Sequence, residues 1–160
     1  MNWLLFFCVV GVCLSSYAVH VEHMKEANPD FEALCDINAS VSCSKVFSSP
    51  QGKIWSYFGL IPKDSVLDVP NAVYGVAFYS LIIVLDQTPA FRKSAVAMNL
   101  MVLLAVFGCI LSLYLAYVLK FVLQDFCIVC VSTYVCNIVV LVGALNRYKL
   151  SAAVKKNKSR

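Results

Sequence analysis

The chain has 160 residues, of which 61% are hydrophobic and 14% are charged. A single soluble core cannot bury so much apolar surface at this length, because a small domain leaves a large fraction of its surface in contact with solvent. The same composition excludes an intrinsically disordered chain. The formal net charge of +4 is small and gives no sign of nucleic-acid binding. The composition therefore indicates a membrane protein whose surroundings are lipid.

Four segments are apolar over nearly all of the roughly 20 residues that a helix needs to cross the hydrocarbon core of a bilayer. Their apolar residues do not alternate with polar ones, so helices are favoured over the strands of a membrane barrel. We therefore predict an all-α membrane protein with a single domain over residues 1–150, built as a bundle of four transmembrane helices. The predicted spans are residues 1–21, 70–88, 94–119 and 126–146, with a long loop at 22–69 and a basic tail at 151–160.

The charges divide unevenly between the two sides of such a bundle. Four spans place both termini and the turn between the second and third spans together, on a side that holds eight of the 13 basic residues and one of the nine acidic residues. The positive-inside rule makes this side cytosolic. The loop at 22–69 and the turn at 120–125 then face a lumen or the exterior, where disulfides persist. One alternative is a signal peptide cleaved after Ser16-Tyr17-Ala18, which would leave three spans.

The most specific motif is Cys127-Ile128-Val129-Cys130, at the luminal entrance and first turn of the fourth predicted helix. On a helix, two intervening residues bring both sulfurs onto one face within disulfide reach, and the helix amino terminus favours a thiolate. We therefore expect this pair to cycle between dithiol and disulfide. The alternatives are half of a zinc site, for which His20 and His23 are the histidines present, and a purely structural disulfide.

Two further cysteines, Cys35 and Cys43, lie in the loop on the same predicted side of the membrane as Cys127 and Cys130. Thiol–disulfide exchange passes through a mixed disulfide, so a mobile pair can take electrons from a soluble partner and pass them to the pair at the membrane. We therefore predict a relay between the two pairs. The alternative is that Cys35 and Cys43 form one static staple of the loop. The remaining cysteines are expected to be buried small apolar side chains: Cys8, Cys13, Cys109 and Cys136.

The side chains expected beside the CxxC motif suit a flat apolar ligand. Tyr134 follows Cys130 by four residues on the same helix face, and Asn71 stands at a similar depth at the start of the second predicted span. Tyr74, Phe78 and Tyr79 follow on the next turns of that span. Aromatic walls would bury the body of a quinone, while Asn71 and Tyr134 donate hydrogen bonds to oxygens that become negative on reduction. The alternative for both polar residues is hydrogen bonding between helices.

Several short motifs occur together along the chain: Ala33-Leu34-Cys35-Asp36, Cys43-Ser44-Lys45-Val46-Phe47-Ser48-Ser49, Asn71 with Tyr74-Gly75 and Phe78-Tyr79, Leu113-Tyr114-Leu115-Ala116, and Asp125-Phe126-Cys127-Ile128-Val129-Cys130 with Thr133-Tyr134. Through this combination, over roughly residues 15–148, the chain resembles the vitamin K epoxide reductase family. The resemblance implies a four-helix bundle in the endoplasmic reticulum membrane. A quinone would bind on its luminal side, under a cap formed by the loop between the first two helices.

The resemblance also implies a role for each paired cysteine. Cys130 would attack the substrate, and Cys127 would resolve the disulfide and exchange with Cys43. Cys35 would receive electrons from a luminal thioredoxin-like partner. The substrate would be vitamin K 2,3-epoxide, reduced to the quinone and then to the hydroquinone with oxidation of a luminal dithiol each time. No tightly bound cofactor and no metal are expected.

Five positions match the substrate contacts of the family. Asn71 and Tyr134 match residues that hydrogen-bond the oxygens of the substrate, and Phe47, Tyr74 and Phe78 match aromatic contacts. The resemblance also makes coumarin-type inhibitors candidate ligands. The loop at 50–59 departs from the usual Arg-Trp-Gly-x-Gly-Phe-Gly of the family, so coumarin sensitivity and epoxide efficiency can differ from the family norm.

Two other functions fit the same residues. One is a quinone reductase that serves mainly as an oxidase of luminal protein thiols and turns over little epoxide. The other is a four-span scaffold without enzymatic activity, in which the cysteines only staple loops. Comparison of epoxide and quinone turnover separates the first alternative from an epoxide reductase, and a CxxC pair that changes redox state with quinone argues against the second.

Overall fold

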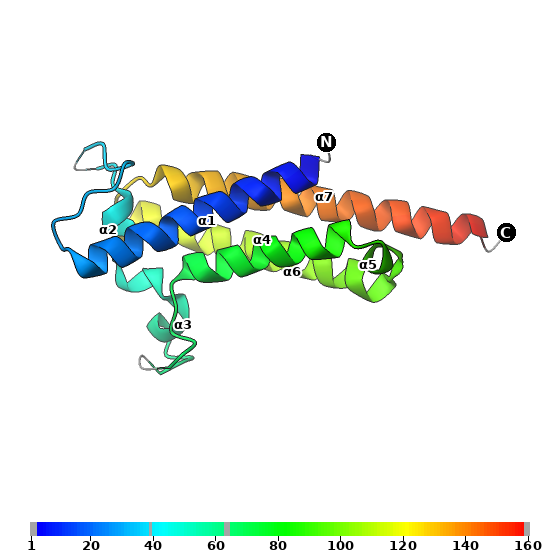
Figure 1. Cartoon of the computed structure of the whole chain (residues 1–160), viewed down its shortest axis with the longest axis horizontal. Coiled ribbons are helices and arrows are strands. Elements are labelled where there is room, and N and C mark those ends of the chain that lie inside the picture. Colours follow the sequence, from blue (N-terminus) through cyan, green and yellow to red (C-terminus); the bar gives the residue numbers. More distant parts are fainter. Residues whose placement is uncertain (1–2, 39, 63–64, 159–160) are drawn as a thin grey trace.

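The computed structural model describes residues 3–38, 40–62 and 65–158, and this part of the chain consists of helices and loops with two isolated β-bridges. Four long helices lie side by side (Figure 1): α1 (Trp3–Ala27), α4 (Asn71–Gln87), α6 (Ala95–Tyr117) and α7 (Ile128–Lys158). Shorter elements connect them: α2 (Cys43–Phe47), a 3-10 turn (Pro50–Gly52), α3 (Ile54–Tyr57), α5 (Pro89–Lys93) and a π-helical turn (Val118–Leu123). The predicted all-α architecture is confirmed.

Three helical segments in the described part of the chain are long and apolar enough to cross a membrane: Trp3–Ala27, Ala95–Leu123 and Ile128–Ala153. The fourth long helix, α4, is also apolar but has 17 residues, fewer than the roughly 20 of a typical span. Large apolar side chains on the outer faces of the bundle are exposed, among them Leu103, Leu113 and Ile138. An outer surface of this kind fits contact with lipid, as expected of a membrane protein.

Two helices extend beyond the predicted spans. α1 continues to Ala27, past the predicted end at residue 21, because no glycine or proline occurs between Val21 and Pro29. α7 begins at Ile128 rather than at 126 and continues through Lys158, so most of the predicted tail at 151–160 is helical. No glycine or proline follows Gly143 to stop it. The predicted ends were placed where apolar character fades, which is a different signal from a helix stop.

The other two long helices match their predicted spans closely. α4 begins directly after Pro70 and ends at Gln87, and the next residue, Thr88, is extended because Pro89 follows it. α6 begins after Ser94, whose hydroxyl oxygen accepts a hydrogen bond from the Ala97 amide at 3.4 Å. These local signals are readable in the sequence and account for where α4 and α6 begin and where α4 ends.

Small residues bring α1 close to α4. A Cβ atom at Gly11 would lie 2.5 Å from the ring of Tyr79, and one at Gly75 would lie 2.6 Å from the Ser15 hydroxyl oxygen. α1 also packs against α7, which in turn packs against α6. One buried cluster fills the space among the long helices, with Leu4, Tyr79, Ile82, Met101 and Val140 among its members. Glycine at these crossings permits a helix separation that a larger side chain would prevent.

The loop segments gather at one end of the bundle (Figure 1). α2 and α3 lie at the end where α1 finishes and where α4 and α7 begin, whereas α5 lies at the other end. A second buried cluster forms at the loop end and includes Val21, Ala33, Cys43, Cys127 and Val129. The fold therefore brings together the two cysteine-bearing segments that lie far apart in the sequence.

Candidate functional site

The four cysteines of the predicted relay form two disulfides. Cys35 is bonded to Cys43, with their Cα atoms 5.8 Å apart, and Cys127 is bonded to Cys130, with their Cα atoms 5.3 Å apart. Among the described residues, no group of three His, Cys, Asp or Glu side chains gathers in a way that could hold a metal ion. The structure therefore presents both cysteine pairs in the oxidised state.

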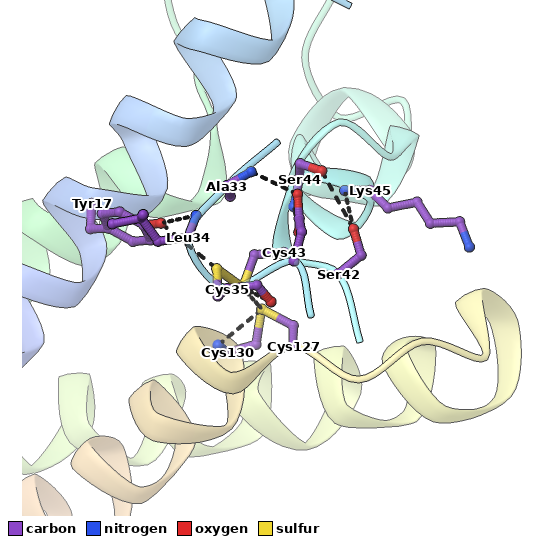
Figure 2. Close-up of a disulfide and its surroundings, with 11 residues drawn as sticks. Tyr17, Ala33, Leu34, Cys35, Ser42, Cys43, Ser44, Lys45, Cys127 and Cys130 are labelled. Carbon is purple, nitrogen blue, oxygen red and sulfur yellow. Dashed lines mark hydrogen bonds between the residues drawn. A yellow bond between two sulfur atoms is a disulfide. The ribbon is translucent and has the colours of Figure 1, made fainter. Parts of the chain in front are cut away.

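The two disulfides are in contact (Figure 2). The sulfur of Cys43 lies 3.7 Å from the sulfur of Cys127, and both residues are completely buried. Cys35 and Cys130, the outer members of the two pairs, are partly buried. Four sulfurs thus form a series in which Cys43 and Cys127 are the inner neighbours, a spacing that permits thiol–disulfide exchange between the pairs.

Cys127 caps the amino terminus of α7. Its carbonyl oxygen accepts a hydrogen bond from the Val131 amide at 3.0 Å, and its sulfur accepts one from the Cys130 amide at 3.2 Å. The side chain thus does what a serine or aspartate does at this position. The sequence placed the motif at the entrance and first turn of this helix, and in the structure Cys127 precedes Ile128, the first residue of α7, while Cys130 lies in the first turn. A helix amino terminus and a hydrogen bond to the sulfur both favour a thiolate at such a position once the disulfide is reduced.

The Cys35–Cys43 loop is organised by the carboxylate of Asp36. One oxygen accepts a hydrogen bond from the Ala33 amide at 2.7 Å, and the other accepts one from the Ser44 amide at 3.0 Å. Burial alone would raise the pKa of Asp36, but these hydrogen bonds outweigh it and lower that pKa to about 2. Ser42 then caps α2, its hydroxyl oxygen accepting a hydrogen bond from the Lys45 amide. Asp36 therefore fixes the backbone on both sides of the disulfide.

Cys35 is the outermost sulfur of the series. It lies 3.9 Å from the hydroxyl of Tyr17 on α1, and that hydroxyl also accepts a hydrogen bond from the Leu34 amide (Figure 2). The Leu34 side chain beside it is 95% exposed. Cys35 is thus tied to α1 but lies next to an open surface.

A cavity of about 430 Å³ adjoins the Cys127–Cys130 disulfide. This disulfide is called the inner pair below, and Cys35–Cys43 the outer pair. Of the four paired cysteines, only Cys130 contributes to its lining. The structure also places all five sequence-predicted ligand contacts in that lining: Phe47, Asn71, Tyr74, Phe78 and Tyr134. A largely apolar cavity of this volume is typical of small-molecule sites. The predicted residues are therefore brought together around one sulfur, and their roles in binding remain predictions.

Asn71 uses its side-chain amide to hold the loop over the cavity. Its oxygen accepts a hydrogen bond from the Ile54 amide at 3.0 Å, and its nitrogen donates one to the Gln51 carbonyl at 2.8 Å. Sequence reasoning assigned this amide to ligand oxygens or to another helix, and did not foresee the loop. In this structure, Asn71 anchors the segment between the 3-10 turn and α3 to the start of α4.

The hydroxyls of Tyr134 and Tyr79 differ in their surroundings. No described residue hydrogen-bonds the Tyr134 hydroxyl, and this side chain lines the cavity. The Tyr79 hydroxyl donates to the side-chain oxygen of Asn137 at 2.7 Å, and Asn137 donates to Ser112 at 2.7 Å. Tyr79 therefore belongs to an interhelical network, whereas the Tyr134 hydroxyl has no hydrogen-bond partner among the described residues.

Three further residues of the cavity lining were missed by the sequence reasoning. Glu22 is buried on α1, Trp55 packs edge-on against Tyr74 with ring centroids 6.0 Å apart, and Gln51 has a buried side-chain oxygen without a hydrogen-bond partner among the described residues. Gln51 and Trp55 lie in the loop whose sequence departs from the family pattern, so no motif identified them. Glu22 carried one signal, a carboxylate directly after the first predicted span.

The four other cysteines are not bonded to one another in the structure. Cys8 and Cys136 are buried as predicted, Cys109 is partly buried, and Cys13 is exposed on α1. The expectation of burial was wrong for Cys13, because the apolar segment that contains it has an outward face as well as a packed one.

Comparison with known proteins agrees with the geometry. A family model described as the vitamin K epoxide reductase family matches residues 2–145. The chain is 42% identical over 134 residues to "Vitamin K epoxide reductase complex subunit 1" of Rattus norvegicus, which covers 81% of this chain and 79% of the relative. It is 41% identical over 135 residues to the protein of the same name from Mus musculus, with 82% and 80% covered. The chain therefore belongs to the vitamin K epoxide reductase family and is an oxidoreductase.

Proposed function

We propose that this protein reduces vitamin K 2,3-epoxide to the quinone and then to the hydroquinone, and that it takes the electrons from luminal dithiols through its two cysteine pairs. The observation that carries the proposal is the position of the inner disulfide. Cys130 lines the apolar cavity, while its partner Cys127 lies 3.7 Å from Cys43. The Cys127–Cys130 pair therefore contacts both the apolar cavity and the Cys35–Cys43 pair.

The cavity suits a naphthoquinone. Phe47, Tyr74 and Phe78 supply aromatic surface for a flat ring system, and the unpartnered hydroxyl of Tyr134 can donate a hydrogen bond to a ring oxygen. The relatives from rat and mouse carry vitamin K epoxide in their names. These features support vitamin K as the substrate class.

Electrons would enter through the outer pair. In the reduced outer pair, the Cys43 thiolate attacks the sulfur of Cys127, forming a Cys43–Cys127 bond and breaking the Cys127–Cys130 bond, so that the electron pair leaves on Cys130. The Cys35 thiolate then attacks Cys43, forms the Cys35–Cys43 disulfide and releases Cys127 as a thiolate. The net result is oxidation of the outer dithiol and reduction of the inner disulfide. A luminal thioredoxin-like protein would reduce the outer pair again.

Substrate reduction would follow in the cavity. The Cys130 thiolate attacks a ring carbon of the epoxide, and the carbon–oxygen bond breaks as the oxygen takes a proton from the Tyr134 hydroxyl or from a water beside it. The Cys127 thiolate attacks the Cys130 sulfur, which forms the disulfide and returns the carbon–sulfur electron pair to the ring. Loss of the hydroxyl as water then gives the quinone. A second dithiol supplies two electrons, and two protons follow, to form the hydroquinone.

We also propose that all four long helices span the endoplasmic reticulum membrane, with the loop segments in the lumen and both termini in the cytosol. α4 has 17 residues and is thus about 26 Å long, a little less than the roughly 30 Å of a hydrocarbon core. Local thinning of the bilayer accommodates a difference of this size at modest cost. The gathering of α2 and α3 at one end supports a cap over the cavity on the luminal side (Figure 1).

The experiment is conversion of vitamin K epoxide by membranes that contain the protein, driven by a small membrane-permeant dithiol. We expect conversion by the unsubstituted chain and none by Cys130→Ala. Cys35→Ala should keep activity with the small dithiol, which reduces the inner pair directly, and should lose activity with a protein dithiol as donor.

Other outcomes identify other functions. Quinone reduction without epoxide conversion would identify a quinone-dependent oxidase of luminal thiols. Failure of a folded chain in both assays would leave a non-enzymatic scaffold. Loss of activity in Cys35→Ala with the small dithiol as well as with the protein dithiol would contradict the relay.

A further inference from the structure

The segment that contains Cys43 and the segment that leads into Cys127 are joined at two points close to these two cysteines. The Phe126 amide donates a hydrogen bond to the Ser40 carbonyl at 2.9 Å, next to an isolated parallel bridge between Val41 and Phe126. The ammonium group of Lys45 lies 3.0 Å and 3.3 Å from the two carboxylate oxygens of Asp125. We call this ion pair and the Ser40–Phe126 hydrogen bond together the clamp.

The clamp brackets the Cys43–Cys127 contact. Ser40 and Lys45 stand three residues before and two residues after Cys43, and Asp125 and Phe126 directly precede Cys127. A single attachment would leave the α2 segment able to pivot about it. Two attachments, one on each side of Cys43, fix both the distance and the direction from which one sulfur approaches the other.

The ion pair joins an exposed lysine to a buried carboxylate. The Asp125 side chain is 4% exposed and the Lys45 side chain is 62% exposed. Lys45 supplies both contacts to that carboxylate that the described residues show. A carboxylate buried without a partner is strongly unfavourable, so Asp125 requires the lysine to remain where it is. The burial of Asp125 therefore ties the position of α2 to the segment that leads into α7.

The ion pair stands apart from the cavity. Neither Lys45 nor Asp125 contributes to the lining that contains Cys130 and Tyr134. Direct reduction of the inner disulfide by a small dithiol, and the chemistry in the cavity, therefore need no contact with this pair. Its geometry serves the meeting of Cys43 and Cys127.

We propose that the Lys45–Asp125 ion pair positions Cys43 for exchange with Cys127 and thereby sets the efficiency of electron transfer between the two cysteine pairs. Lys45 and Asp125 are positioning residues, since neither contacts the substrate. This inference rests on the proposed relay. Because a displacement of about 1 Å can slow a reaction roughly a hundredfold, loss of the ion pair should affect exchange far more than the fold.

The first test measures the Cys43–Cys127 disulfide itself, without any turnover of vitamin K. The full chain carrying Cys35→Ala and Cys130→Ala keeps Cys43 and Cys127, which can then bond only to each other among the four relay positions. Membranes are equilibrated with mixtures of reduced and oxidised glutathione, and the bonded fraction is read from the mass added by thiol alkylation. We expect Lys45→Met to lower the equilibrium constant for this disulfide about tenfold, and Lys45→Arg to preserve it.

Two further variants separate positioning from damage to the fold. Lys45→Met with Asp125→Asn removes both charges, so no unpaired carboxylate is left buried, and the disulfide should still be weakened. Lys53→Met removes the exposed ion pair with Glu26, whose nitrogen–oxygen distance is 3.3 Å, and should leave the disulfide unchanged. An equilibrium constant that is the same with and without Lys45 would overturn the proposal.

The second test compares two electron donors with all four relay cysteines present. Reduced thioredoxin is too large to enter the cavity, whereas dithiothreitol is small enough to reach Cys130. Lys45→Met should slow thioredoxin-driven turnover about tenfold or more and change dithiothreitol-driven turnover less than about twofold. Equal slowing with both donors would overturn the proposal. Absence of epoxide turnover by the unsubstituted chain would count against the proposed function instead, and the disulfide equilibrium would still decide the role of Lys45.

Discussion

The sulfurs of Cys43 and Cys127 lie 3.7 Å apart although the two residues are 84 positions apart in the chain. One belongs to a short helix in the loop, and the other caps the helix whose first turn lines the cavity. Their contact makes one assembly out of two local motifs, each of which would otherwise be an ordinary disulfide.

Tyr134→Phe should reduce turnover while leaving stability almost unchanged. Its hydroxyl lines the cavity without a hydrogen bond from any described residue, so its removal leaves no protein group unpaired. If the hydroxyl stabilises a developing oxygen anion, the turnover number should fall roughly a hundredfold. Steady-state kinetics and the thermal midpoint in detergent measure the two effects.

The matched control is Tyr79→Phe, which removes the same atom from a buried network. The Tyr79 hydroxyl donates to Asn137 at 2.7 Å, so its loss should lower the free energy of unfolding by about 1–3 kcal/mol. The assignment of the two hydroxyls would be contradicted if Tyr134→Phe were less stable than Tyr79→Phe and as active as the unsubstituted chain.

Asn71→Ala should loosen the loop over the cavity and raise the KM for the substrate. It removes the hydrogen bonds to the Ile54 amide and the Gln51 carbonyl, each worth about 1 kcal/mol, so local opening should increase about tenfold or more. The rate of tryptic cleavage after Lys53, which lies between these two residues, measures the opening. Gln51→Ala is the control because it keeps the carbonyl that Asn71 binds, and equal cleavage in both variants would argue against anchoring by Asn71.

Order in the Cys35–Cys43 loop should depend on pH through Asp36. Hydrogen bonds outweigh burial and lower the pKa of this carboxyl from 3.8 to about 2, so its stabilising effect is present in full above 3.8 and is lost as the pH falls through about 2. Hydrogen-exchange protection of the Ser44 amide should decrease over that interval. In Asp36→Asn the protection should be lower at neutral pH and should not change over this interval. The same acid dependence in Asp36→Asn would assign the effect to another group.

Gly11→Ala should destabilise the contact between α1 and α4. The new Cβ would lie 2.5 Å from the Tyr79 ring, so a buried side chain or a helix must shift, at a cost of about 1–3 kcal/mol. Gly108→Ala places a Cβ 3.3 Å from the tip of Phe78 and should cost less. The thermal midpoints of the two variants in the same detergent measure the difference, and the reverse order would contradict the packing described for Gly11.

Local patterns in the sequence predicted the features that depend on neighbouring residues. The CxxC spacing predicted the Cys127–Cys130 pair, and Pro70 and Pro89 predicted the ends of α4, because these signals act within one turn of helix. The helical periodicity also placed Tyr134 on the same side of α7 as Cys130, and both line the cavity.

Features that join distant residues could not be predicted in this way. The Lys45–Asp125 pair spans 80 positions, and Asn71 binds loop residues 17 and 20 positions away, with no periodic signal on either side. The length of α7 was missed for another reason. Hydropathy indicates where a helix leaves an apolar medium, and it does not indicate where the helix itself ends. α7 continues because no glycine or proline follows Gly143 to end it.

Because Cys43 and Cys127 are completely buried, soluble thiols have no direct access to these two sulfurs. Of the four paired cysteines, only Cys35 and Cys130 keep exposed surface, one beside the open loop and the other inside the cavity. Under the proposed relay, a quinone bound in the cavity covers Cys130 and leaves Cys35 as the contact for electrons from outside. The redox state of the Cys127–Cys130 pair would then follow whichever dithiol reacts at Cys35.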